Sequence, residues 1–127
     1  MSQTFTILVA EDEAANAELI KDLLESRSFQ VLCASNGQEA TEIATNNLPD
    51  LILMDLRMPK LNGLQATRTL KNNDDTKNIP VVALTASVMD GTEQKVFDGG
   101  CVGYIKKPIT VATFVDELKE YLPVEKT

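Results

Sequence analysis

The chain has 127 residues, of which 43% are hydrophobic and 24% are charged, a size and composition typical of one globular domain with a real core. Its net charge of −7 argues against nucleic-acid binding, because a phosphate backbone attracts a basic surface. No apolar run is long enough to span a bilayer, and no basic stretch precedes the first apolar segment. We therefore expect neither a membrane anchor nor a signal peptide.

The chain contains no histidine, which excludes Ser-His-Asp catalysis, Cys-His catalysis and zinc sites built on histidine. It also means that the chain cannot itself carry a phosphohistidine. Its two cysteines, Cys33 and Cys101, are far apart and form no CxxC motif, which fits a cytoplasmic protein with reduced thiols. Any chemistry therefore falls to carboxylates, hydroxyls and lysines.

Short apolar runs alternate with segments of helical spacing along the chain. Most of the runs are continuous rather than alternating, which is typical of parallel strands covered on both faces. From these runs we predict strands over residues 6–10, 29–34, 51–54, 81–84 and 103–105.

After each strand comes a segment in which apolar residues recur at the helical period. Asn36-Gly37 and Asn62-Gly63 open the second and third of these segments, and Gly99-Gly100 ends the fourth, which covers 90–99. Repeating strand and helix five times predicts one domain over 1–127 with a three-layer α/β/α sandwich. The apolar stripes of the other helices are Ala17, Ile20, Leu23 and Leu24; Ala40, Ile43 and Ala44; Leu64, Thr67 and Leu70; and Val111, Phe114, Val115, Leu118 and Leu122.

Chemically active side chains follow four of the five predicted strands. In a parallel sheet ligands bind beyond the carboxyl ends of the strands, so these side chains should converge. Clustered carboxylates repel one another, and a hard cation such as Mg²⁺ relieves that repulsion. A cation held there can neutralise a phosphoryl group while a carboxylate attacks the phosphorus. The residues are Glu11 and Asp12, then Asp55, then Thr85, then Lys106 and Lys107.

Each of these residues alone has an ordinary structural explanation. The Glu11-Asp12 pair could be solvated or could cap a helix, and Asp55 could simply end a strand in a turn. Thr85 could be a strand former that runs into a turn, and a single lysine usually lies on the surface. Their joint occurrence at four strand ends on one edge favours a functional site.

The motifs together resemble the receiver domains of bacterial two-component response regulators, and the resemblance covers nearly all of the chain. The segments that carry it are LVAEDE, DLILMDLRMPKLNG, ALTAS and GYIKKPI. The resemblance implies a CheY-like, flavodoxin-like fold with five helices and a five-stranded parallel sheet in the order 2-1-3-4-5. Asn16 and the GGC that precedes GYIKKPI resemble single-domain cell-cycle regulators and the receivers of hybrid kinases.

The resemblance also implies a role for each site residue. Glu11 stands where many members have aspartate, a departure that lengthens the arm but keeps the charge. The lysine of the family precedes a proline whose peptide bond is commonly cis, which identifies it as Lys107 rather than Lys106. The implied roles are phosphoacceptor for Asp55; Mg²⁺ ligands for Glu11, Asp12, Asp55 and the carbonyl of Arg57; phosphoryl contact for Lys107; and conformational switch for Thr85 and Tyr104.

The implied function is that of a cytoplasmic phosphorelay switch rather than an enzyme for an external substrate. A sensor histidine kinase or a histidine phosphotransfer protein would donate the phosphoryl group, and the domain would catalyse its own phosphorylation and dephosphorylation. The output would pass by protein contact to a downstream target or to a second copy of the chain. The implied surface comprises the fourth helix, the fifth strand and the fifth helix, around Val96, Tyr104, Lys106 and the exposed side of 110–122.

Three other interpretations fit the sequence less well. A flavodoxin-type FMN protein needs a phosphate-binding turn after its first strand, where this chain has Glu11 and Asp12, which repel phosphate. The Walker motif of nucleotide-binding proteins, GxxxxGK[ST], is absent as well. A haloacid-dehalogenase-like phosphatase usually has a second aspartate two positions after its nucleophile, where this chain has Arg57. A receiver fold that serves only as an interaction module would not need the complete set of site residues.

Overall fold

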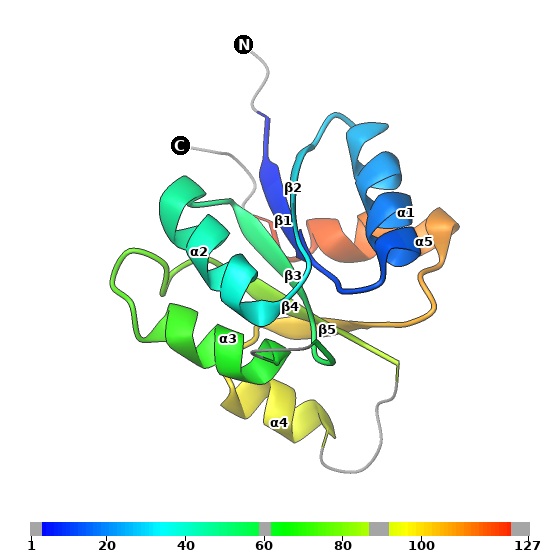
Figure 1. The fold of residues 1–127 in the computed structure, drawn as a ribbon. Helices are drawn as coiled ribbons and strands as arrows, with labels where there is room; N and C mark the ends of the chain where they lie inside the picture. Colours follow the sequence, from blue (N-terminus) through cyan, green and yellow to red (C-terminus); the bar gives the residue numbers. More distant parts are fainter. Residues whose placement is uncertain (1–3, 59–61, 87–91, 123–127) are drawn as a thin grey trace.

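The structure is a computed structural model that describes residues 4–58, 62–86 and 92–122 (Figure 1). Strands and helices alternate along the described chain, as predicted. Their bounds are β1 Thr6–Ala10, α1 Ala14–Glu25, β2 Gln30–Ala34, α2 Gly37–Asn47, β3 Leu51–Asp55, α3 Gly63–Lys71, β4 Val81–Thr85, α4 Thr92–Asp98, β5 Gly103–Lys106 and α5 Val111–Lys119.

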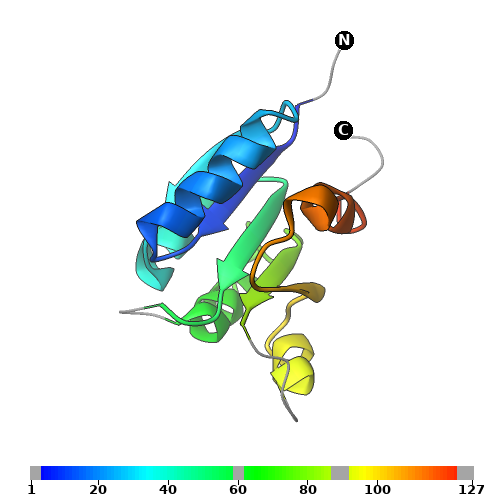
Figure 2. The same ribbon diagram turned by 90° about the vertical axis from the view of Figure 1, so that its right-hand side faces the viewer.

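The strands form one parallel sheet in the order β2-β1-β3-β4-β5, which confirms the predicted sheet order. Helices α1 and α5 cover one face of the sheet, and α2, α3 and α4 cover the other (Figures 1 and 2). The result is the three-layer α/β/α sandwich expected when helical crossovers connect parallel strands.

Each face of the sheet has its own apolar cluster because alternate strand residues point to opposite sides. The central strands β3 and β4 are buried along their whole length, which explains their continuous apolar runs. Toward α1 and α5 the buried cluster is Ile7, Val9, Ile20, Leu24, Leu51, Leu53, Val82, Leu84, Ile105, Phe114, Val115 and Leu118. Toward α2, α3 and α4 it includes Leu8, Ala10, Ala40, Ala44, Ile52, Met54, Ala66, Leu70, Ala83 and Val96.

Strands β3, β4 and β5 each end one residue later than predicted. Asp55 and Thr85 are therefore the last residues of their strands rather than the first residues beyond them. The ladders continue past these positions, because the Leu56 N–H donates to the Leu84 carbonyl at 3.2 Å and the Lys107 N–H donates to the Thr85 carbonyl at 2.7 Å. Their backbones are thus held by the sheet.

The other predicted strand and helix bounds differ from the structure at a few ends. Strand β2 begins at Gln30 rather than at Phe29, because the Phe29 N–H donates to the Leu24 carbonyl at the end of α1. Helix α5 ends at Lys119, so the predicted stripe extends beyond it to Leu122, which lies in a tight turn and still packs against the apolar cluster. Residues 90 and 91 of the predicted fourth helix lie outside the described residues.

Helix α4 corrects one residue of the predicted output surface. Val96 is completely buried against the sheet, whereas the adjacent Phe97 is 44% exposed. Consecutive residues of a helix point about 100° apart, so Val96 and Phe97 cannot both face the sheet directly. The sequence of such a short helix does not show which of the two faces inward. On the described part of α4, the exposed apolar residue is therefore Phe97, not Val96.

Helix α3 approaches the end of β3 closely because its first residue is a glycine. Asn62 caps the helix through a reciprocal pair of hydrogen bonds with Gln65. A Cβ on Gly63 would clash with the Asp55 carbonyl oxygen and with the Leu56 Cα. The missing side chain thus lets α3 begin directly against the backbone of Asp55.

We expect Gly63→Ala to lower the free energy of unfolding by about 3 kcal/mol, the upper part of the usual range for overpacking. The added Cβ meets backbone atoms, which move only if β3 or α3 shifts. Gly103→Ala is the matched control, because its Cβ would meet the end of the Tyr121 ring, which can turn away. Urea unfolding should show a clearly larger loss for Gly63→Ala, and equal losses would contradict this account.

Candidate functional site

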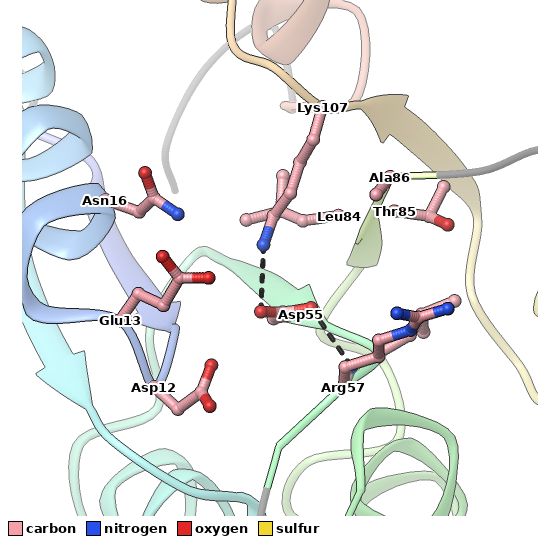
Figure 3. A pocket seen from close by; sticks show the side chains of 10 residues that line it. Asp12, Glu13, Asn16, Asp55, Arg57, Leu84, Thr85, Ala86 and Lys107 are labelled. Atoms are coloured by element: carbon pink, nitrogen blue, oxygen red, sulfur yellow. Dashed lines mark hydrogen bonds and ion pairs between the residues drawn. The ribbon is translucent and has the colours of Figure 1, made fainter.

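A pocket of about 550 Å³ opens at the carboxyl ends of β1, β3 and β4 (Figure 3). Most of its walls come from loops that follow these strands and from the first turn of α1, as expected for a parallel sheet. Its lining residues are Asp12, Glu13, Asn16, Asp55, Leu56, Arg57, Leu84, Thr85, Ala86 and Lys107.

Strand alternation explains why particular side chains meet at this edge. Asp55 follows Leu53 by two positions, and Leu53 points toward α1 and α5. By the same count Glu11 follows Val9 and Lys107 follows Ile105, which point to that face as well. The side chains of Glu11, Asp55 and Lys107, at the ends of three different strands, therefore lie on the same side of the sheet.

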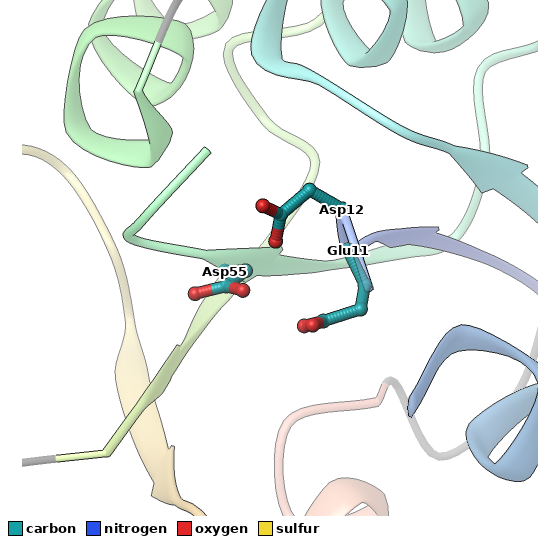
Figure 4. A group of neighbouring side chains, drawn as sticks. All are labelled: Glu11, Asp12 and Asp55. Atoms are coloured by element: carbon teal, nitrogen blue, oxygen red, sulfur yellow. The ribbon is translucent and has the colours of Figure 1, made fainter. Parts of the chain in front are cut away.

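Carboxylates of Glu11, Asp12 and Asp55 form a cluster in which one oxygen of each lies within 4.8 Å of the others (Figure 4). Glu11 is 2% exposed and Asp55 is 4% exposed, whereas Asp12 is exposed. So many negative charges in such a small volume repel one another, and burial removes the water that would screen them. The predicted convergence of these side chains is thus present in the structure.

Lys107 supplies the positive charge at the centre of the cluster. Its Nζ donates a hydrogen bond to Asp55 Oδ2 at 2.9 Å and lies 3.0 Å from Glu11 Oε2. Desolvation by itself would lower the pKa of Lys107, but its contacts with Asp55 and Glu11 outweigh that effect, and the pKa is raised. Lys107 therefore stays charged as the counter-ion that both carboxylates share.

Burial raises the pKa of the Glu11 carboxyl, and the neighbouring Asp55 raises it further. The contact with Lys107 offsets only part of this increase. Although Glu11 Oε2 lies 3.0 Å from the lysine, the angle there is not that of a hydrogen bond. Within the described part of the chain, Glu11 Oε2 is thus a buried oxygen without a hydrogen-bond donor.

This arrangement fits a hard divalent cation. Carboxylate oxygens are the ligands that Mg²⁺ prefers, and the ion usually keeps several waters. Asp12 is exposed and so leaves room for those waters, while Glu11 Oε2 is the buried oxygen that lacks a hydrogen bond. The donor set of Glu11, Asp12 and Asp55 therefore suits Mg²⁺.

The backbone after β3 orients the Asp55 side chain. The Arg57 N–H donates to Asp55 Oδ1 at 3.0 Å, so one oxygen of Asp55 faces the loop while the other faces Lys107. The Arg57 side chain is exposed. This hydrogen bond places the Arg57 backbone beside the cluster, the location at which its carbonyl is predicted to contribute to the metal site.

Thr85 and Tyr104 lie on the opposite side of the sheet from Lys107. Ala83 pairs with Tyr104 in the β4–β5 ladder, and Thr85 lies two residues beyond Ala83, so the three side chains share one face. Thr85 is buried, whereas Tyr104 is half-buried and packs against the cluster beneath α4. The Thr85 hydroxyl is turned away from Asp55 (Figure 3).

Lys106 and Lys107 occupy the positions predicted for them. Lys106 ends β5 with an exposed side chain, whereas Lys107 reaches into the pocket. The Lys107–Pro108 peptide bond is cis, in agreement with the resemblance.

Sequence reasoning missed two polar residues of the pocket lining as parts of the site, Glu13 and Asn16. Both come from the segment that turns from β1 into α1, and Asn16 Nδ2 donates to Glu11 Oε1 at 3.4 Å. The sequence signal is their location: a polar residue in the first turn of a helix that follows a strand end faces the same edge as that end.

We expect Lys107→Ala to impair the response to phosphorylation far more than Lys106→Ala. Losing Lys107 leaves Glu11 and Asp55 without their shared counter-ion, so the free energy of unfolding at neutral pH should also fall. Because the pKa of Lys107 is raised, its stabilisation is present below the ordinary lysine value of about 10.4 and is lost as pH rises through the folded-state pKa.

Urea unfolding, together with a sizing or partner-binding assay of the phosphorylated proteins, measures both effects. Lys106→Ala is the matched control, since it removes the same group from the neighbouring, exposed position. A larger defect in Lys106→Ala would overturn the assignment of the two lysines.

No helix in the described ranges is both long and apolar enough to cross a membrane.

Among curated proteins, the chain is similar to the polar-differentiation response regulator DivK of Brucella anthropi. The two are 41% identical over 117 residues, and the alignment covers 92% of this chain and 95% of DivK.

Solved structures show the same relationship. The receiver domain of the sensor histidine kinase PA1611 from Pseudomonas aeruginosa, described with a magnesium ion in its active-site cleft, matches with a TM-score of 0.86 and 30% identity over 94% of this chain and 98% of that one. A second match is to the co-crystal structure of the Saccharomyces cerevisiae histidine phosphotransfer protein Ypd1 with the receiver domain of its downstream response regulator Ssk1. The TM-score is 0.86 and the identity 26%, over 93% of this chain and 88% of that one.

The family model of the response regulator receiver domain matches residues 7–119, which span every strand and helix described above except the first residue of β1. A polar-differentiation response regulator and the receiver of a sensor histidine kinase, both similar to this chain, agree with the subgroups that the sequence resembles. The match also decides against the flavodoxin-type and phosphatase interpretations. The chain belongs to the response regulator receiver domain family and functions as a phosphorelay receiver.

Proposed function

We propose that Asp55 of this receiver accepts the phosphoryl group, in a Mg²⁺-dependent reaction. The observation that carries the proposal is the environment of Asp55: its carboxylate ends the central buried strand, lines the pocket and contacts Lys107 at 2.9 Å. Glu11 and Asp12 lie beside it within 4.8 Å. A buried carboxylate with an open side and a nearby cation site is suited to act as a nucleophile toward phosphorus.

The reaction exchanges one bond to phosphorus for another. An oxygen of Asp55 bonds to the phosphorus of a phosphohistidine as the phosphorus–nitrogen bond breaks, and the imidazole nitrogen keeps the electron pair and takes up a proton. Mg²⁺ held by Glu11, Asp12, Asp55 and the Arg57 carbonyl would neutralise the phosphoryl oxygens. Lys107 donates a second charged contact to the phosphoryl group. Attack of water on phosphorus later releases phosphate and restores the Asp55 carboxylate.

These 127 residues contain no histidine, so a phosphohistidine that donates to Asp55 would lie outside them. The similarity to a histidine kinase receiver and to a receiver solved with a phosphotransfer protein supports a sensor histidine kinase or a histidine phosphotransfer protein in this role. Such donors act in the cytoplasm, where we place this domain. Its chemistry is then limited to its own phosphorylation and dephosphorylation.

Incubation with a small phosphodonor such as phosphoramidate tests this proposal. With Mg²⁺ the intact mass should rise by one phosphoryl group, and with EDTA it should not. Sizing of the same samples reports whether phosphorylation produces a homodimer. The absence of labelling in Mg²⁺ would contradict the proposal and favour a module that only binds partners.

We further propose that Thr85 and Tyr104 transmit phosphorylation to the face formed by α4, β5 and α5. The Thr85 hydroxyl, now turned away from Asp55, would rotate to donate to a phosphoryl oxygen. A hydrogen bond to a charged acceptor contributes about 1.5–3 kcal/mol, which shifts a two-state equilibrium by about ten- to a hundredfold. Tyr104, half-buried on the same face, would then turn inward and reshape the surface formed by α4, β5 and α5.

Thr85→Ala should still take up phosphate on Asp55 but should lose the coupled change at Tyr104. The measurement is quenching of Tyr104 fluorescence with and without beryllofluoride, in a Tyr121→Phe background. This background leaves Tyr104 as the single tyrosine and keeps the ring that packs against Gly103. If Tyr104 reports no change while partner binding or dimerisation still switches, another element carries the signal.

A further inference from the structure

The Glu11 side chain poses a positioning problem that a shorter aspartate would not. It is 2% exposed, it carries an extra methylene group, and it stands next to two other carboxylates. A buried carboxylate without fixed partners would turn toward the nearest cation, which here is Lys107 at 3.0 Å. A second contact must therefore fix the orientation of this carboxylate if it is to keep one oxygen directed at a metal ion.

The two oxygens of Glu11 have different surroundings. Oε2 faces Lys107 and lacks a hydrogen bond from the described residues, whereas Oε1 accepts a hydrogen bond from Asn16 Nδ2 at 3.4 Å. The amide of Asn16 therefore contacts the oxygen that Lys107 does not. Because Asn16 carries no charge, it can orient the carboxylate without competing with a cation for its negative charge.

The location of Asn16 suits this role. It lies in the first turn of α1, whose backbone begins at Ala14 directly after the acidic segment. It lines the site pocket and also a neighbouring cavity of about 360 Å³, whose other lining residues include Lys107 and Ile109. Asn16 and Lys107 thus line both cavities, and they contact different oxygens of the Glu11 carboxylate.

We propose that Asn16 is a positioning residue that holds the Glu11 carboxylate for Mg²⁺, an inference that rests on the metal site of the proposed function. Its hydrogen bond fixes Oε1 on the α1 side, so that Oε2 remains directed at the carboxylate cluster. Without Asn16, Glu11 can turn both oxygens to Lys107, and this ion pair competes with the metal. The contact also depends on the length of Glu11, because an aspartate at position 11 would end one methylene short of Asn16.

Groups that orient metal ligands typically change metal affinity by about 10–100-fold when they are removed. Since the hydrogen bond is long, we expect Asn16→Ala to weaken Mg²⁺ binding by about tenfold, the lower end of that range. In a Glu11→Asp background the same substitution should change the affinity by less than about twofold, because the interaction is already absent. This dependence on residue 11 would not arise if Asn16 served only the stability of α1.

Calorimetric titration with Mg²⁺ of wild type, Asn16→Ala, Glu11→Asp and the double variant tests the inference. Asn47→Ala is the matched control, because Asn47 is an exposed helical asparagine that bonds to a carbonyl of its own helix. It should bind Mg²⁺ like the wild type. Urea unfolding in EDTA should show that Asn16→Ala remains folded, since alanine favours a helix more than asparagine does.

Equal Mg²⁺ affinity of wild type and Asn16→Ala would overturn the inference and leave the proposed function intact. An equal loss in both backgrounds would also overturn it, because Asn16 would then act independently of Glu11. Failure of the wild type to bind Mg²⁺ would overturn both proposals. If Glu11→Asp binds no metal, the side-chain amide signal of Asn16 in NMR decides: it should shift when Mg²⁺ is added to the wild type, while the Asn47 signal stays in place, and an unchanged Asn16 signal would contradict the proposal.

Discussion

Asp55→Asn is expected to fold like the wild type and to accept no phosphoryl group. The substitution keeps the shape of the side chain, and the amide can still bond to the Arg57 N–H and remain beside Lys107. It removes the nucleophilic oxygen and one charge of the carboxylate cluster. Intact-mass measurement after incubation with phosphoramidate and Mg²⁺ should show full labelling of the wild type and none of the variant.

Asp50→Asn is the matched control for this experiment. Asp50 directly precedes the same strand, β3, and accepts a hydrogen bond from the Thr6 N–H at 2.7 Å, far from the pocket. This variant should be labelled as efficiently as the wild type. Full labelling of Asp55→Asn would show that another side chain receives the phosphoryl group.

Asp12→Ala should weaken Mg²⁺ binding by more than about tenfold. Removal of a group that only orients a metal ligand already costs about that much, and Asp12 is proposed to be a ligand itself. Labelling from a phosphodonor should stop with it. Asp12 is the exposed member of the cluster and the one through which a hydrated ion would approach. Glu18→Ala is the control, because it removes an exposed carboxylate on α1 that is outside the pocket lining.

The same Asp12 substitution should raise the free energy of unfolding in EDTA. Glu11, Asp12 and Asp55 repel one another, and Lys107 contacts only Glu11 and Asp55 among them. Removing Asp12 therefore relieves repulsion without breaking an ion pair of Lys107. Labelling that proceeds equally well in EDTA, or a loss of stability in Asp12→Ala, would contradict this account of the cluster.

Much of the fold could be predicted from the sequence because its signals are local and repeated. The continuous apolar runs of β3 and β4 reflect strands buried on both faces, and Asn36 and Asn62 cap the helices that they precede. The ends were less predictable, because backbone hydrogen bonds from distant residues decide them. The bond from the Lys107 N–H to the Thr85 carbonyl is one example.

The candidate site could be predicted as far as the strand ends determine it. Asp55 and Lys107 meet because alternation places them on one face of a parallel sheet, a rule that is readable once the strands are known. The contact between Asn16 and Glu11 could not be predicted, because it depends on where the first turn of α1 places its side chains. The same reason applies to Val96, whose burial depends on the rotation of a short helix about its axis.

The most direct test of the central claim is to locate the phosphoryl group on the chain. The wild type is labelled with phosphoramidate in Mg²⁺, treated with borohydride to reduce the acyl phosphate to an alcohol, digested, and sequenced by mass spectrometry, with an EDTA sample beside it. We expect the reduced residue at position 55, only in the Mg²⁺ sample. Reduction at another carboxylate, or equal reduction at position 55 in EDTA, would contradict the assignment of Asp55 as a Mg²⁺-dependent phosphoacceptor.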